Sequence, residues 1–403
     1  MESKNKIQRL GELAALFLKL GIIGFGGPAA HIAMMEDEVV GRRKWLTREH
    51  FLDLVGASNV IPGPVSTKMS IFVGYIHAGW PGLIIAGTCF IIPAVLITAG
   101  FAWAYVKFGS LPQVSSLLYG IKPAVLAVIF TAVWRLGKTA VKGWRLLIIG
   151  LAVASASIFG MNEVIALLIG GGIGMFWLRI SDLGRSLSNK KGLITLAGIT
   201  TSVIPKTAKA TGISLAAIVG SGTVAAIDVS LLKLGLFFLK VGAILFGGGY
   251  VLVAFLEGGL VHDYGWMTQQ QLLDAIAIGQ FTPGPVLSTA TFIGYLISGV
   301  DGAVVATVAI FLPSFLFVVV LNPVIPRLRR SRWTSAFLDA VNVSAVGLMA
   351  AVIVKLSEAT LISWATWLIA LVAIVVGLRW KVNATWLVLG GAITGWLLSV
   401  LAV

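Results

Sequence analysis

Two stretches built around the same Pro-Gly-Pro turn carry side chains suited to binding an anion. The first is NVIPGPVSTK at 59–68, and the second is QFTPGPVLST at 280–289. In each, an amide side chain precedes the turn and hydroxyl side chains follow it, and these groups can donate hydrogen bonds to oxyanion oxygens. Only the first stretch ends in a basic residue. We predict an oxyanion site that includes the following residues of the two stretches: Asn59, Pro62, Gly63, Pro64, Ser66, Thr67, Lys68, Gln280, Thr282, Pro283, Gly284, Pro285, Ser288 and Thr289.

The rest of the chain is far more apolar than a soluble protein. Of its 403 residues, 58% are hydrophobic and 11% are charged, and the mean hydropathy is +0.98. A helix of about 20 apolar residues crosses a bilayer core. Five uncharged windows are long enough: 81–106, 275–300, 302–326, 359–378 and 382–403. The sequence therefore predicts an all-α polytopic membrane protein in a lipid bilayer. The net charge of +14 is assigned to loops that orient the chain, and not to nucleic-acid binding.

Glycine-rich motifs precede both turns, FGGP at 25–28 and FGGG at 246–249. A proline after glycine suits a turn in which a new helix begins. A helix that begins inside the membrane presents unpaired N–H groups and a positive dipole end, which attract anions. These motifs add six predicted site residues: Gly26, Gly27, Pro28, Gly247, Gly248 and Gly249. The alternative is that the glycines and prolines serve helix packing, and that the hydroxyls bond their own helices.

The motifs belong to an internal repeat. FLKLGIIGFGG at 17–27 matches FLKVGAILFGG at 238–248 in eight of eleven positions, at an offset of 221 that becomes 220 after the turns. We predict one repeat at 1–180 and a second at 231–403. The linker at 181–230 is expected to cross the membrane once, at 210–228.

Matched loops of the two repeats have opposite charge. Loop 36–50 has four basic residues and its counterpart 257–270 has none, whereas loop 327–332 has four arginines and its counterpart near 107–116 only Lys107. Because basic loops stay in the cytoplasm, the halves are predicted to be inserted upside down, as in secondary transporters.

The same rule predicts re-entrant hairpins. The basic N-terminus and loop 36–50 should share one side, so segment 12–34 should enter, break at GFGGP and return, and 51–78 should do so at Pro-Gly-Pro. Kinked spanning helices are the alternative, and a count of about nine to thirteen membrane segments remains open.

At this point the paired FGG and PGP motifs resemble the CHR family, the ChrA-type chromate ion transporters, over nearly the whole chain. The resemblance implies a multi-pass protein of the bacterial inner membrane that exports chromate, a sulfate-like tetrahedral dianion, from the cytoplasm and so confers chromate resistance. It also implies that the glycines and prolines of the four motifs serve the anion. The chain departs from its own pattern at Gly249, where the first repeat has Pro28.

Four carboxylates at two repeat positions are candidates for proton coupling: Glu36 with Glu257, and Asp53 with Asp274. Alternatively they are interfacial anchors or partners of loop arginines. The sequence has no catalytic cluster and no nucleotide-binding loop, so we expect a transporter driven by an ion gradient, with no enzyme activity, cofactor or metal. A transporter or channel for another oxyanion, such as sulfate or molybdate, is the competing interpretation. The oligomeric state is open, and a homodimer is one assembly that the sequence allows.

Overall fold

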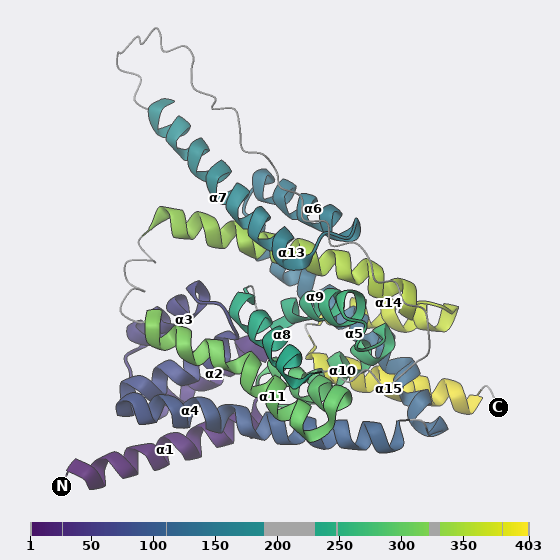
Figure 1. The fold of residues 1–403 in the computed structure, drawn as a ribbon, viewed down its shortest axis with the longest axis horizontal. Coiled ribbons are helices and arrows are strands. Elements are labelled where there is room, and N and C mark those ends of the chain that lie inside the picture. The colour runs from purple at the N-terminus through teal and green to yellow at the C-terminus, as the bar shows by residue number, and fades with distance from the viewer. Residues whose placement is uncertain are drawn as a thin grey trace.

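The computed structural model describes residues 2–25, 27–109, 111–188, 230–246, 249–321, 331–380 and 382–401, and this part of the chain is helical without strands (Figure 1). The all-α class is therefore confirmed. The first repeat contains α1 (Glu2–Ile23), α2 (Gly27–Glu36), the π-helix η1 (Asp37–Arg42), α3 (Arg48–Val60), α4 (Val65–Phe108), α5 (Pro112–Ala140), α6 (Trp144–Ile158) and α7 (Glu163–Ser188). The second contains α8 (Leu231–Ile244), η2 (Gly249–Val251), α9 (Leu252–Leu256), η3 (Glu257–Asp263), α10 (Gln269–Phe281), η4 (Val286–Ser288), α11 (Thr289–Leu321), α13 (Arg332–Thr360), α14 (Trp364–Arg379) and α15 (Ala384–Leu401).

Five helical stretches are long and apolar enough to cross a membrane: Val65–Phe108, Ser116–Ala140, Glu163–Ile180, Val286–Val320 and Arg332–Thr360. Three shorter apolar helices are α6, α14 and α15. The prediction that 275–300 crosses as one helix is wrong, because α10 ends at Phe281 and the Pro-Gly-Pro turn interrupts the window. The predicted crossing at 210–228 lies outside the described residues, and the repeat boundaries stay a prediction.

Both long helices that follow the Pro-Gly-Pro turns fold back on themselves. Non-helical backbone occurs at Ala78 and Gly79 in α4 and at Ser298 and Gly299 in α11, which are matching positions of the repeats. After the second bend, Thr291 and Thr307 come within 2.7 Å through their hydroxyl oxygens. Residues this far apart in a straight helix would be separated by about 24 Å. Each apparent long helix is therefore a short returning helix followed by a full span.

Contacts on one face show that the broken segments of the first repeat are re-entrant. The ring of Trp45 stacks on His77 with centroids 3.9 Å apart, and His77 Nε2 lies 3.9 Å from Glu12 Oε2. Arg48 at the start of α3 pairs with Glu36 near the end of α2 at 3.2 Å. Because the segments begin and end on the same face, their breaks lie at the deep ends of two hairpins, as the charge pattern predicts.

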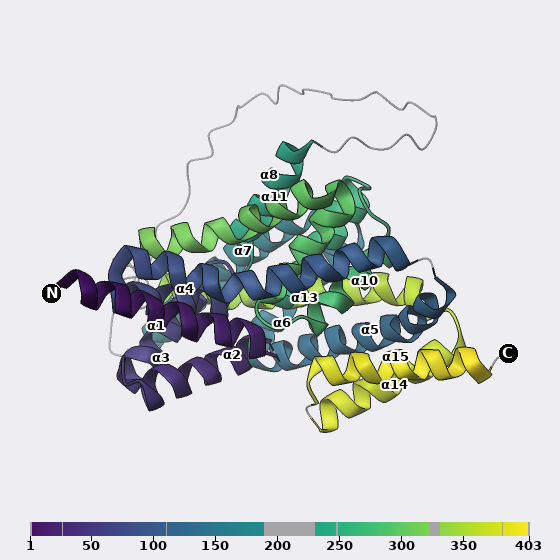
Figure 2. The ribbon, with the colours of Figure 1, turned by 90° about the horizontal axis from the view of Figure 1, so that it is seen from below.

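The two repeats have inverted orientations. In both views α4 and α11 run in opposite directions, and so do α5 and α13 (Figures 1 and 2). The halves also exchange matching hydrogen bonds. Gly63 N–H donates to the Leu245 carbonyl, and Gly284 N–H donates to the Gly24 carbonyl, each at 2.7 Å. Contacts that repeat in both directions between equivalent positions are the mark of a two-fold relation between two units.

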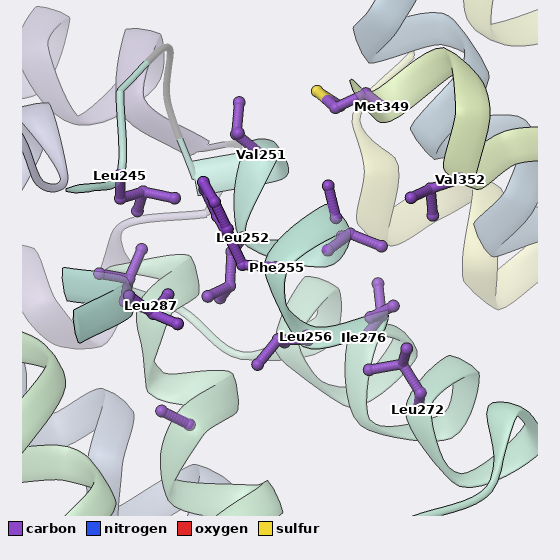
Figure 3. Packing of buried hydrophobic residues seen from close by; sticks show 14 of the residues in the cluster. Leu245, Val251, Leu252, Phe255, Leu256, Leu272, Ile276, Leu287, Met349 and Val352 are labelled. Atoms are coloured by element: carbon purple, nitrogen blue, oxygen red, sulfur yellow. The ribbon is translucent and has the colours of Figure 1, made fainter. Parts of the chain in front are cut away.

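The short helical segments after the second FGG motif are held by the core. Val251, Leu252, Phe255 and Leu256 are buried. Figure 3 shows them between Leu245 and Leu287 on one side and side chains of α10 and α13 on the other. A helix as short as α9 is not stable by itself. The packing of α9 therefore determines where the backbone breaks, and it holds Gly249 and Tyr250 in place.

Candidate functional site

A cavity of about 350 Å³ lies beside the first Pro-Gly-Pro turn, and we call it the Lys68 cavity. Three predicted site residues line it, namely Asn59, Gly63 and Lys68. The opposite wall is provided by α5, by the end of α8 and by α13. The structure thus places the only basic residue of the two Pro-Gly-Pro stretches at the wall of a cavity between the repeats.

Lys68 is buried to 1% exposure and holds the end of the preceding helix together. Its ammonium group donates to the carbonyl of Ser58 at 2.5 Å and to the carbonyl of Ile61. A cation is favoured there because the carbonyl end of a helix carries a partial negative charge. A lysine ammonium has three N–H donors, so one remains for a ligand. No carboxylate among the described residues pairs with Lys68, and carbonyl dipoles alone offset its charge.

The other polar groups of the Lys68 cavity favour an anion as well. Lys142 lines it and pairs with Asp339 at 2.7 Å, so two lysines and one aspartate leave an excess of one positive charge. Asn342 adds an amide. The Ser58 hydroxyl is fully buried and has no partner among the described residues. Such a group usually bonds to water or a ligand, and here it lines the same cavity as the ammonium group.

A second cavity, of about 490 Å³, lies where the two FGG breaks meet, and we call it the Arg135 cavity. Pro28 and the first turn of α2 line it from one break, and Gly249 and Tyr250 from the other. Arg135 of α5 and Asn383 complete its polar lining. Pro28 and Gly249, one from each FGG motif, thus line the same cavity. Gly26, Gly247 and Gly248 lie outside the described residues, and Gly27 has a positive φ of 79° but does not line the cavity.

The glycines of the Pro-Gly-Pro turns connect the halves to each other. Gly63 and Gly284 have φ angles of 102° and 86°, a region that favours glycine. Their N–H groups already donate across the repeat interface. In this conformation these two N–H groups are not free for an anion, and a contact of either turn with an anion stays a prediction. The helix that follows Pro64 still begins with N–H groups that have no partner in the preceding turn.

The hydroxyl groups on both sides of the second turn bond to Thr98 of α4 or to the backbone of their own segment. Thr98 Oγ1 donates within a cluster in which Thr282 Oγ1 lies at 3.3 Å and Ser288 Oγ at 3.2 Å. Thr289 donates to the carbonyl of Val286 at 2.8 Å. The following predicted residues line neither of the two cavities: Pro62, Pro64, Ser66, Thr67, Gln280, Thr282, Pro283, Gly284, Pro285, Ser288 and Thr289. A contact of any of these with an anion stays a prediction.

Of the first pair of carboxylates, Glu36 is partly exposed and Glu257 is fully buried. The carboxylate of Glu257 lies 3.1 Å from Lys355 Nζ and 2.7 Å from His262 Nε2. Near Glu36, the neighbouring Glu38 is the more buried group. A hydrogen bond from Lys19 lowers the pKa of Glu38, and nearby arginines act in the same direction.

The second pair also differs, since Asp53 is exposed and Asp274 is buried. The Asp274 carboxylate accepts a hydrogen bond from Tyr105 at 2.8 Å and lies 3.6 Å from Lys122 Nζ. Asp274 and Lys122 line a cavity of about 610 Å³ near the start of α5. Of the four candidates for proton coupling, only Glu257 and Asp274 are thus removed from solvent.

Sequence reasoning missed several residues that line the two anion-facing cavities, including Arg135, Lys142, Tyr250, Asn342 and Asn383. The position of Arg135 inside an apolar stretch, 220 residues before Lys355, was the available signal. Asn342 and Tyr250 have no local pattern that separates them from other helix residues.

The chain is similar in sequence to known proteins over nearly its full length. A family model described as chromate transporter matches residues 11–175 and 232–396, one match in each half. The chain is 32% identical over 389 residues to a chromate transport protein of Cupriavidus metallidurans, covering 96% of this chain and 92% of that one. It is 33% identical over 375 residues to a probable chromate transport protein of Synechococcus elongatus, covering 93% and 91%. An uncharacterized transporter of Bacillus subtilis is 29% identical over 164 residues, covering 39% of this chain but 92% of its own length. No solved structure matches this chain.

Proposed function

Because the chain belongs to the chromate transporter family, we propose that it is a secondary active transporter that exports chromate from the cytoplasm across the bacterial inner membrane. Chromate resistance would follow from this export. The substrate is a tetrahedral dianion, and sulfate is the competitor expected from its similar shape and charge. The chain is a multi-pass membrane protein, and its long apolar helices can surround a path through the bilayer.

The Lys68 cavity is the observation that carries this proposal. It combines a buried ammonium group without a carboxylate partner, a second lysine and a buried hydroxyl without a partner in the described part of the chain. Ionisable groups at membrane depth are costly and are mostly retained for function. A dianion in this cavity would supply the negative charge that the protein does not provide.

The position of the basic loops supports export. A cavity of about 460 Å³ is lined by Lys142 and Arg145 from one basic loop and by Arg332 from the other. Both loops are cytoplasmic by the positive-inside rule. This outer cavity shares Lys142 and Asp339 with the Lys68 cavity. Basic residues around an entrance raise the local concentration of anions, so an anion would be collected on the cytoplasmic side.

For coupling, we propose Glu257 and Asp274 in preference to Glu36 and Asp53. Both are buried and both contact a lysine, so a change in protonation would alter an ion pair between helices. An exposed carboxylate exchanges protons without affecting the packing around it. Protons are therefore the proposed coupling ion.

The test is chromate uptake into inverted membrane vesicles, with a pH gradient and a Na⁺ gradient varied separately and sulfate added as competitor. We expect saturable uptake that depends on the pH gradient and is inhibited by sulfate. Flux that does not saturate and ignores both gradients would indicate a channel. Uptake of sulfate or molybdate without chromate would indicate a transporter for another oxyanion.

A further inference from the structure

Arg135 is an exposed cation near the end of α5, without an anionic partner among the described residues. One of its Nη groups donates to the carbonyl of Gly377 at 2.7 Å, which is its one hydrogen bond among the described residues. A guanidinium group has five N–H donors in a planar arrangement. No carboxylate in the described ranges pairs with it. Several of its donors are thus left for whatever occupies the Arg135 cavity.

In the second repeat, the cation at the position equivalent to Arg135 has a carboxylate partner. Lys355, which matches Arg135, pairs with Glu257 at 3.1 Å. The residue that matches Glu257 in the first repeat is Glu36, and it pairs with Arg48 instead. The first repeat therefore keeps the cation and directs the carboxylate elsewhere. This difference leaves Arg135 facing a cavity, whereas Lys355 is closed in an ion pair.

The surroundings of Arg135 are rich in donors. The first turn of α2 faces the cavity through Ala29 and Ala30, so the positive end of that ten-residue helix is directed toward it. Tyr250 adds a hydroxyl and Asn383 adds an amide. Planar guanidinium groups match oxyanions through paired hydrogen bonds. The described residues that line the Arg135 cavity include no Asp or Glu.

The three cavities on the basic side follow one another along the α5 region. The outer cavity includes 142–146, the Lys68 cavity includes residues from Leu136 to Lys142, and the Arg135 cavity includes residues from Val128 to Leu136. Leu136 lines both of the inner cavities. At 1.5 Å per residue, Arg135 lies about 7 Å deeper along the axis than Ala140, the last residue of α5.

We propose that Arg135 binds a tetrahedral oxyanion at a second position, deeper than Lys68, and that the substrate passes from one cavity to the other beside Leu136. This inference rests on the proposed function, because the ligand of the second position is the transported anion. A guanidinium group suits this position because the anion must lose its hydration shell there. In exchange, the anion can accept two hydrogen bonds from one side chain. The anion then balances the charge of Arg135, as Glu257 balances the charge of Lys355.

The test is equilibrium binding of radiolabelled sulfate and of chromate to purified full-length protein. Arg135→Gln should weaken binding at least tenfold, and Arg135→Lys should recover part of the loss. Lys138→Gln is the matched control, because Lys138 lies on the same helix with its ammonium group over Trp134 and does not line the cavity. It should bind as the wild type does. Normal binding by a folded Arg135→Gln protein would overturn the proposal.

A second pair of variants keeps the test decisive if Arg135→Gln fails to fold. Thr131 lies one helical turn before Arg135 and lines the same cavity. Thr131→Asp places a carboxylate where it can pair with the guanidinium group, while Thr131→Asn has nearly the same shape without charge. We expect at least tenfold weaker binding for Asp than for Asn, and equal affinities would contradict the proposal. If the wild type binds neither anion, the proposed function fails. If the wild type binds an anion and the Arg135 and Thr131 variants bind it equally well, only the proposal of a second position is wrong.

Discussion

At the scale of single residues, Lys68 combines a structural contact with an available charge. Two of its N–H groups hold carbonyls at the end of α3, the third has no partner among the described residues, and Lys68 lines the cavity. Its burial would be costly if these contacts did not offset the loss of hydration. A substitution therefore affects both the shape of the turn and the charge of the cavity, and the two effects need separate measurements.

Lys68→Ala should weaken chromate transport by about tenfold to a hundredfold, because a hydrogen bond to a charged group contributes about 1.5–3 kcal/mol. Lys68→Arg should retain part of the activity, since it restores the charge with different geometry. Uptake is measured in vesicles at equal abundance of the protein, and thermal unfolding reports the structural part. The control is Ser58→Ala, which removes an uncharged donor and should cost only a few-fold. Wild-type kinetics in the Ala variant would remove Lys68 from the site.

At the scale of elements, the breaks in the helices connect the two halves. The Pro-Gly-Pro turn of each half docks against the end of the first helix and the long span of the other half. A Cβ atom on Gly63 would lie 2.5 Å from Ser314 Oγ, and one on Gly284 would lie 3.0 Å from Ala94 Cβ. Ser314 and Ala94 are matching positions of the repeats. The glycines are thus required by close approach as well as by their backbone angles.

Gly63→Ala should destabilise the protein more than Gly265→Ala. Both glycines have positive φ, which costs an alanine about 1–2 kcal/mol, but only Gly63 also has a neighbour within 4 Å. Adding Ser314→Ala to Gly63→Ala should restore part of the loss, since it removes the atom that a Cβ would meet. The thermal unfolding midpoints of the four purified proteins check this. Equal midpoints for the Gly63 and Gly265 variants would show that the turn is not packed as described.

At the scale of the whole molecule, inversion brings equivalent helices together in opposite directions while their side chains differ. The outer cavity, the Lys68 cavity and the Arg135 cavity all lie toward one end of α5. The cavity lined by Asp274 and Lys122 lies near its other end. Two repeats with nearly the same backbone thus provide a cationic path on one side and buried carboxylates on the other. Alternating access between such halves is typical of inverted repeats.

Loops 36–50 and 257–270 should lie on opposite sides of the membrane. In a Cys89→Ala background, His50→Cys should react with an impermeant thiol reagent only from the cytoplasmic side. Tyr264→Cys should react only from the outer side, and both positions are exposed. Labelling of intact cells and of inverted vesicles measures the side. Labelling of both loops from one side would contradict the inverted orientation.

Much of the architecture could be predicted from local features of the chain. Uncharged windows, the 221-residue offset, and the distribution of Lys and Arg each depend on nearby residues or on counting, so they indicated a polytopic protein with two inverted, broken repeats. The positions of Lys68 and of Pro28 beside cavities could be predicted because the motif and the break coincide. The tight bends at Gly79 and Gly299 could not, because such a bend is selected by the packing of Gly74 on Gly82 and of Gly294 on Gly302.

What the sequence by itself determined is therefore the membrane environment, the repeat and the places where helices break, since hydropathy, proline and glycine act locally. Only the tertiary structure decided which groups at those breaks remain free. The N–H groups of Gly63 and Gly284 donate hydrogen bonds to carbonyls some 180 and 260 residues away along the chain. Arg135 has no carboxylate partner among the described residues, since Glu36 pairs with Arg48. Hydrogen bonds and ion pairs are satisfied by whichever partner the fold brings within about 3 Å, and no local pattern reports that partner.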